Sequence, residues 1–215
     1  MKKLDGFRLI GFHGPARSGK DTLIAMLQQQ FSVPSVAFSD AIYDEVQQAY
    51  RLRTQDVLRS VHTKDAPTRL MRPTGCHDLA FRKLLAIKGH HDNEELSPRQ
   101  VLQYWGDHRR AKDPIYFIKM TAKRISHLPQ GIVLISGVRS QNEADFIRGN
   151  DGFLIHVHRD VAKVNDHKIE AALPVHHHDT ELDNNGSIQE LEATAIKLAQ
   201  SIGMVAPRHG FAMKP

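Results

Sequence analysis

The sequence predicts an α/β protein with a mostly parallel sheet of four or five strands and helices on both faces. Two observations predict this fold class. Short apolar runs of β-forming residues alternate with segments of helical spacing, which is the pattern of layered α/β folds. Several of the helical segments also begin at a recognisable cap. The 215 residues, 40% hydrophobic and 25% charged, suit one globular domain with room for a small inserted lobe.

The first elements read as strand, loop, helix, strand and helix. The run "FRLIGF", Phe7–Phe12, predicts a buried strand that a glycine-containing loop follows. The segment "DTLIAMLQQQF" after that loop has helical spacing. A second strand is expected at Ser35–Ser39 and a helix at Asp40–Tyr50. Strand, glycine loop and helix together are the context in which a phosphate-binding motif is credible.

The middle of the chain predicts helices. Residues 51–95 show no clear pattern apart from a helix at "DLAFRKLLAIKG", and we assign them to an inserted lobe. A helix should start at Ser97, which forms a capping box with Gln100 and has proline in the first turn. Another should start at Asp113, again with proline in the first turn.

The last part of the chain returns to alternating strands and helices. Strands are expected at Gly131–Ser136 and Phe153–His158, with the short helix "NEADFIRGN" between them. The polar tract Arg159–Asn185 has no obvious core face and is interpreted as a mobile segment, its "HHHD" run included. A final helix should run from Ser187, boxed by Glu190, to Gly203.

Composition indicates the cellular compartment of the protein and the charge of its ligand. No apolar run approaches the roughly 20 residues that cross a bilayer, and the N-terminal segment lacks a signal-peptide core. The single cysteine, Cys76, excludes an internal disulfide and fits a reducing compartment, so we expect a cytoplasmic protein. The formal net charge of +5 suits an anionic ligand, either nucleotide phosphates or nucleic acid.

The segment "GFHGPARSGKDTL" predicts a phosphate-binding loop. Gly14, Gly19 and Lys20 have the GxxxxGK spacing, in which backbone N–H groups and the start of the next helix surround phosphate oxygens. Lys20 would reach the terminal phosphates, and Thr22 could bond an inner one. The residues expected to bind ATP are Gly14, Ala16, Arg17, Ser18, Gly19, Lys20, Asp21 and Thr22.

Asp21 occupies the position after the lysine where Ser or Thr usually coordinates magnesium. A carboxylate can also bind Mg²⁺, which prefers oxygen ligands and keeps several waters. The alternative is a carboxylate that only favours the start of a helix. We expect Asp21 to be the metal ligand.

This loop resembles that of a known family, the bacteriophage-type deoxynucleoside monophosphate kinases among the P-loop kinases. The segment "GPARSGKDT" is similar to that family's loop, including its Asp. The segments "FSDAI", "SPRQVLQYWG", "SGVRSQNEA", "HKIEAALPV" and "NNGSIQEL" resemble its later motifs in the same order. The likeness spans nearly the whole chain except residues 51–95.

The resemblance implies a fold and an activity. It implies a three-layer P-loop kinase sandwich over residues 1–215, with a helical substrate lobe at about 45–128 and a lid at about 159–185. It implies ATP-dependent phosphorylation of deoxynucleoside monophosphates, with ATP and Mg²⁺ as cofactors. Small molecules would be the partners, with neither membrane nor nucleic acid, and a homodimer is compatible with the family. A phage-encoded protein would act in the host cytoplasm.

The resemblance also implies roles for single residues. Lys20, Arg17, Arg139 and Arg159 are expected to act on the transferring phosphate, because arginine holds phosphate oxygens at two points. The residues expected to bind the acceptor are Asp40, Arg99, Gln103, Arg139, Asn142 and Glu143. Two positions depart from the family. Tyr43 stands where a lysine is common, and Gly137 stands where an aspartate is usual.

Two other functions stay open. The same fold could phosphorylate another small phosphorylated molecule, such as dephospho-coenzyme A. Alternatively, Gly137 could mark a catalytically weak relative that binds nucleotide as a regulatory or nucleic-acid-binding protein.

Overall fold

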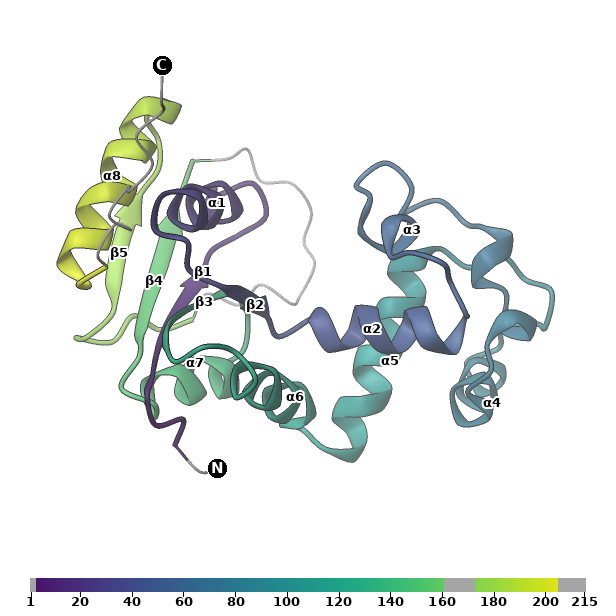
Figure 1. Ribbon diagram of the computed structural model, residues 1–215. Helices are drawn as coiled ribbons and strands as arrows, with labels where there is room; N and C mark the ends of the chain where they lie inside the picture. The colour runs from purple at the N-terminus through teal and green to yellow at the C-terminus, as the bar shows by residue number, and fades with distance from the viewer. Residues whose placement is uncertain (1–2, 161–172, 205–215) are drawn as a thin grey trace, which may run out of the picture. The chain divides into compact units, whose positions relative to one another are not determined.

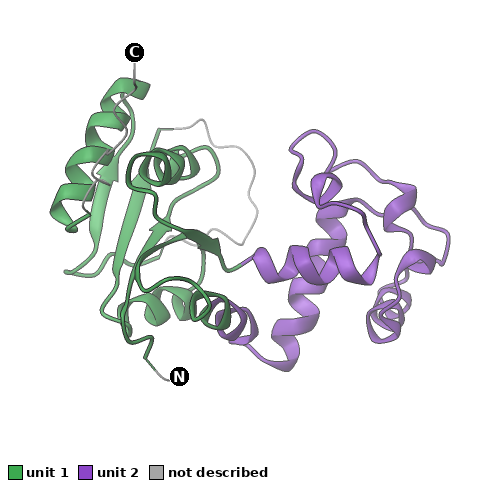
Figure 2. Cartoon of the chain, in the orientation of Figure 1, with its two compact units in different colours: residues 1–38, 122–215 green, residues 39–121 purple. Residues whose placement is uncertain are grey.

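A computed structural model describes residues 3–160 and 173–204. The chain folds into two compact units, of which unit 1 comprises residues 1–38 and 122–215 and unit 2 comprises residues 39–121 (Figure 2). Unit 1 contains one sheet whose five strands all run parallel, in the order β2-β3-β1-β4-β5 (Figure 1). The strands are β1 (Phe7–His13), β2 (Ser35–Ala37), β3 (Gly131–Val138), β4 (Phe153–His158) and β5 (Thr180–Asp183). This is the predicted α/β fold class.

Helices cover both faces of the sheet. Helices α1 (Lys20–Phe31) and α8 (Ile188–Ser201) pack together on one face, and α7 (Gln141–Arg148) packs on the other (Figure 1). The core beneath α1 and α8 contains Ile10, Phe12, Leu23, Leu27, Leu191 and Ala195. On the opposite face, a Cβ at Gly11 would lie 2.3 Å from Ile147 Cδ1, so α7 approaches β1 closely only because residue 11 is glycine.

Unit 2 is helical and has its own core. It contains α2 (Asp40–Ala49), α3 (Asp56–Arg59), α4 (Leu79–Ile87) and α5 (Pro98–Lys112), and α6 (Tyr116–Ile125) begins in it. Its fully buried side chains include Leu58, Met71, Phe81, Leu85, Val101 and Trp105. One carboxylate ties three helices together: Glu45 accepts hydrogen bonds from Trp105 Nε1, Arg109 Nε and Tyr116 Oη.

Most predicted elements are confirmed. The capping boxes at Ser97 and Ser187 are present, and Ser140 with Glu143 forms a third. Two expectations were wrong in detail. Helix α6 begins at Tyr116, because Asp113–Ile115 form a turn in which Asp113 Oδ1 accepts from the N–H of Ile115. The tract Arg159–Asn185 contains strand β5, which buries only Leu182.

Within the described ranges, none of the helices is both long enough and apolar enough to cross a membrane.

Candidate functional site

The loop between β1 and α1 needs its glycines for conformation and for space. Gly14 (φ 153°) and Gly19 (φ 91°) have positive φ values, and Arg17 (φ 67°) joins them in the left-handed region. A Cβ on Gly14 would lie 2.5 Å from the carbonyl oxygen of Val157, at the end of β4. The loop therefore lies directly against the carboxyl end of a neighbouring strand, where ligands bind in such sheets.

Lys20 is held inside this loop. Lys20 is 7% exposed, and its Nζ lies 3.3 Å from the carbonyl oxygen of Pro15 and 3.7 Å from Asp21 Oδ2. Ser18 is wholly buried, and its hydroxyl has no hydrogen-bond partner among the described residues. The buried ammonium of Lys20 and the buried hydroxyl of Ser18, which has no partner among the described residues, fit an anionic ligand at this place.

The start of α1 offers backbone donors to the same ligand. The N–H groups of Gly19, Lys20, Asp21 and Thr22 have no acceptor in the described part of the chain, and no side chain caps this helix. A helix N-terminus in this state attracts anions through its N–H groups and its dipole. Ala16, Arg17, Asp21 and Thr22 are exposed. The predicted ATP-binding residues therefore surround the loop and the first turn of α1, where a ligand can reach them.

The segment after β3 lies beside the loop. His13 of β1 pairs with Val138 of β3, so Gly14 and Arg139 leave from adjacent strand ends. The side chains of Arg139 and Asn142 are exposed there. Glu143 is different, because it is buried and its carboxylate accepts the N–H groups of Arg139 and Ser140 at 2.8 Å and 3.1 Å. In this structure Glu143 braces the backbone that carries Arg139.

Strands β4 and β5 bring two more segments to this edge. Exposed Arg159 directly follows β4. Asn184 directly follows β5, and its side chain reaches the loop by donating to the carbonyl oxygen of Ser18 at 2.7 Å. Sequence reasoning missed Asn184, since the two residues are 166 positions apart. Of the expected lid at 159–185, residues 161–172 lie outside the described part of the chain.

The remaining predicted residues lie in unit 2. Arg99, at the start of α5, forms a bidentate ion pair with Asp65, and Gln103 is exposed one turn later. The Asp65 hydrogen bonds raise the pKa of Arg99, which keeps the guanidinium charged. The structure thus brings Arg99 and Gln103 together on α5.

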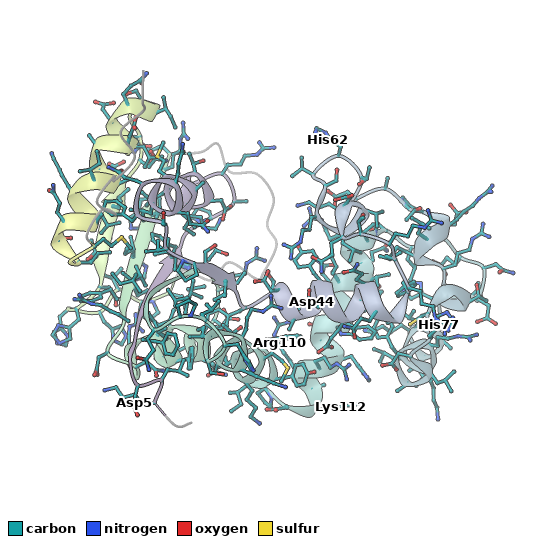
Figure 3. All side chains as sticks on the ribbon, viewed as in Figure 1. Asp5, Asp44, His62, His77, Arg110 and Lys112 are labelled. Carbon is teal, nitrogen blue, oxygen red and sulfur yellow. The ribbon has the colours of Figure 1, made fainter. Side chains whose placement is uncertain are left out.

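Asp40, at the start of α2, is linked to Arg59 at the end of α3. Arg59 Nη2 lies 3.3 Å from Asp40 Oδ1, and the guanidinium lies 4.1 Å above the ring of Tyr43. Gln55 extends the chain of contacts, since it accepts from Arg59 and donates to Asp44, which Figure 3 labels on α2. A cation therefore lies over Tyr43, the position where the family resemblance led us to expect lysine.

The "HHHD" run has a structural role at Asp179. Its carboxylate, 1% exposed, accepts from Arg148, from His156 Nε2 at 3.1 Å and from the N–H of His176 at 2.9 Å. Burial alone would raise the pKa of Asp179, but these hydrogen bonds outweigh it and lower the pKa from 3.8 to about 2. No group of three or more His, Cys, Asp or Glu side chains in the described ranges could hold a metal ion.

Comparisons with known proteins agree on one family. The family model described as "Deoxynucleotide monophosphate kinase" matches residues 62–195, more than half of the chain. The protein named "Putative deoxynucleotide monophosphate kinase" from Acanthamoeba polyphaga mimivirus is 28% identical over 196 residues, which cover 87% of this chain and 94% of that protein.

Two solved structures that this chain resembles are more distant in sequence. A sugar kinase from Janibacter sp. HTCC2649, in its unliganded form, has a TM-score of 0.39 and 11% identity, over 93% of this chain and 96% of that one. TT1252 from Thermus thermophilus has a TM-score of 0.44 and 16% identity, over 90% of this chain and 97% of that one. Neither likeness is close enough to bear on function.

Proposed function

Since the chain belongs to the deoxynucleotide monophosphate kinase family, we propose that it transfers the γ-phosphoryl group of ATP to a deoxynucleoside monophosphate. The observation that carries the proposal is the loop between β1 and α1. It surrounds a buried lysine, ends in backbone N–H groups that have no acceptor among the described residues, and lies beside Arg139. These are the features that bind the phosphates of a nucleotide.

The proposed reaction depends on positioning and charge. An oxygen of the acceptor's phosphate forms a bond to the γ-phosphorus, the bond to the β,γ-bridging oxygen breaks, and ADP leaves. The attacking oxygen belongs to a phosphate that is already ionised near neutral pH, so it needs no strong general base. Lys20, Arg17, Arg139 and Arg159 are proposed to neutralise the charge that builds up on the transferred group.

Magnesium has a suitable ligand on the first turn of α1. The Asp21 side chain is 78% exposed and lies beside the Lys20 ammonium, so a carboxylate oxygen is available next to the proposed phosphates. One protein carboxylate with phosphate oxygens and waters is an ordinary Mg²⁺ environment. When bound there, the ion would neutralise phosphate charge, and Asp21 would hold it.

Roles in acceptor binding are proposed for Arg99, Gln103 and Asp40, which lie in unit 2, and for Arg139 and Asn142, which lie in unit 1. Arginine suits the acceptor's phosphate and an amide suits the edge of a base. For Glu143 the observed backbone contacts favour an indirect role, in which it holds Arg139 in place. A cytoplasmic location, a homodimer and the absence of a nucleic-acid partner stay predictions.

The test is an acceptor screen. Purified protein with ATP and Mg²⁺ is given each of the four deoxynucleoside monophosphates, and dephospho-coenzyme A in parallel, while ADP release is followed. We expect ADP with at least one deoxynucleoside monophosphate. Lys20→Met keeps the buried chain but not the charge, so it should cut turnover by about a thousand-fold. The control is Lys83→Met at an exposed position of α4, with turnover near wild type.

Two results would contradict the proposal. One is ADP release with dephospho-coenzyme A alone, which would assign the other acceptor class. The other is near-normal turnover in folded Lys20→Met, which would remove the loop from the reaction.

A further inference from the structure

Asn184 is a buried residue at the start of the segment "NNGSIQEL", and the sequence pattern predicts no role for its side chain. It is 5% exposed, and its backbone N–H donates to the carbonyl oxygen of His158 at 2.8 Å, which extends the pairing of β5 with β4. Its position is thus fixed by the sheet. Its side-chain Nδ2 then donates to the carbonyl oxygen of Ser18, inside the loop between β1 and α1, at 2.7 Å.

The amide of Asn184 also fills the space beside Gly19. A Cβ on Gly19 would lie 2.1 Å from Asn184 Nδ2, closer than any real contact between such atoms. Gly19 has a φ of 91°, a conformation that other residues rarely adopt. The glycine and the asparagine therefore require each other, because one leaves the space that the other occupies.

The contact with Ser18 controls the direction of a backbone donor. The peptide group between Ser18 and Gly19 is planar, and in a trans peptide the C=O and the N–H point in opposite directions. Because Asn184 binds the Ser18 carbonyl, the Gly19 N–H must point away from Asn184. That N–H and the next three have no acceptor in the described part of the chain.

We propose that Asn184 is a positioning residue for the donor nucleotide: its amide holds the Ser18–Gly19 peptide in the orientation that lets the loop bind phosphate. The inference rests on the proposed function, since it assumes that the loop binds ATP. Asn184 itself acts through the loop backbone. The bond to the Ser18 carbonyl is buried, so without the amide that carbonyl would lose its hydrogen bond, and rotation of the peptide would become favourable.

The experiment compares two variants with a matched control in the full-length protein. Asn184→Asp keeps the size but replaces the donor with an acceptor, and Asn184→Leu keeps the size without any charge. Asn150→Asp is the control, because Asn150 is 8% exposed and its Nδ2 donates to a backbone carbonyl in a buried bond, that of Phe146, also at 2.7 Å. That bond lies at the end of α7, whereas the loop precedes α1.

ATP affinity by titration calorimetry, thermal unfolding and the two KM values are measured for each protein. We expect both Asn184 variants to weaken ATP binding about ten-fold or more, the size of one lost hydrogen bond, with the KM for the acceptor within about two-fold of wild type. Asn150→Asp should lower the unfolding temperature comparably and leave ATP affinity unchanged. A purely structural role would reduce the active fraction, and hence kcat, without changing the ATP dissociation constant.

The outcomes separate the two proposals. If wild type binds ATP and both Asn184 variants bind it within about two-fold, the inference is wrong while the proposed function stands. If wild type binds no ATP, the proposed function fails and the inference with it. If either variant does not fold, Asn184→Ser, which is smaller but polar, takes its place, and the same ten-fold criterion decides.

Discussion

Asp179 shows what one buried carboxylate contributes to this structure. A depressed pKa stabilises the folded protein above the unfolded pKa, and the stabilisation disappears as pH falls through the folded value. For Asp179 the window runs from 3.8 down to about 2. The difference is worth about 2 kcal/mol of folding free energy at neutral pH.

We therefore expect Asp179→Asn to lower the free energy of unfolding by at least about 2 kcal/mol at pH 7, and the deficit to shrink as pH falls below about 4. Urea unfolding of both proteins at several pH values measures this. Asp145→Asn, which changes an exposed carboxylate that also faces Arg148, is the control and should cost less than about 1 kcal/mol. A deficit that does not vary with pH would show that Asp179 matters for packing alone.

The second prediction for a single residue concerns Asp21 and the magnesium dependence of the rate. Asp21→Asn keeps the size but removes the charge beside Lys20, so we expect the magnesium concentration for half-maximal rate to rise several-fold or more. Affinity for metal-free ATP should stay the same or improve, because a negative charge near the phosphates is gone. Asp21→Ser should recover part of the activity. A magnesium titration of the initial rate is the measurement.

An unchanged magnesium dependence in Asp21→Asn would show that Asp21 only favours the start of α1.

Gly137 stands where the family resemblance led us to expect an aspartate near the metal. It has a φ of 65° and lies where the pairing of β3 with β1 is irregular, while a Cβ there would meet nothing within 4 Å among the described residues. The glycine that departs from the expected aspartate thus occupies a left-handed position with open space beside it.

Residues of the candidate site differ in how much signal for them the sequence carries. Gly14, Gly19 and Lys20 can be proposed from the sequence alone, because their spacing is itself the signal. Glu143 was predicted to bind the acceptor, whereas its buried backbone contacts favour a role in bracing Arg139. Asn184 lies in the segment "NNGSIQEL", but the role of its side chain was not predicted, since that role comes from a contact with Ser18 that only the folded sheet creates.

At the scale of elements, α5 raises a question that a pair of variants can answer. Arg99 is proposed to bind the acceptor, yet it is already paired with Asp65. If Arg99 binds the acceptor's phosphate, Arg99→Ala should raise the KM for the deoxynucleoside monophosphate about ten-fold or more. Asp65→Asn, which removes only the pairing carboxylate, should change that KM far less.

The KM for ATP serves as the internal control for both variants and should stay constant. An exposed ion pair contributes little to folding, so neither variant should unfold the protein. Equal small effects of the two variants on both KM values would mean that the Arg99–Asp65 pair only links α5 to the preceding segment.

The elements that the sequence predicted well are those with local signals. Ser97 and Ser187 cap their helices through residues three positions on, so their boxes can be read directly. Strand β5 was missed because it is a short strand at the edge of the sheet. It buries one side chain, Leu182, and shows no apolar pattern that would distinguish it from a polar loop.

At the scale of the whole molecule, alternation of strands and helices was enough to predict a parallel sheet. The strand order β2-β3-β1-β4-β5 could not be predicted in this way, because it depends on pairings between distant segments. The division at residues 38 and 121 is likewise set by two separate cores, of which the one in unit 2 uses residues from the stretch where the sequence pattern was unclear.

The central place of β1 has a consequence for synthesis of the protein. Both strands that pair with β1 begin after residue 130, so a ribosome finishes all of unit 2 before either neighbour exists. Unit 2 is continuous and has its own core, so it can fold on the nascent chain. Until β3 and β4 emerge from the ribosome, β1 has no strand to pair with, and its apolar side chains stay exposed on the nascent chain. Nascent chains halted once unit 2 has left the ribosome, but before β3 has, should therefore carry a folded unit 2 behind an N-terminal segment that chaperones can bind.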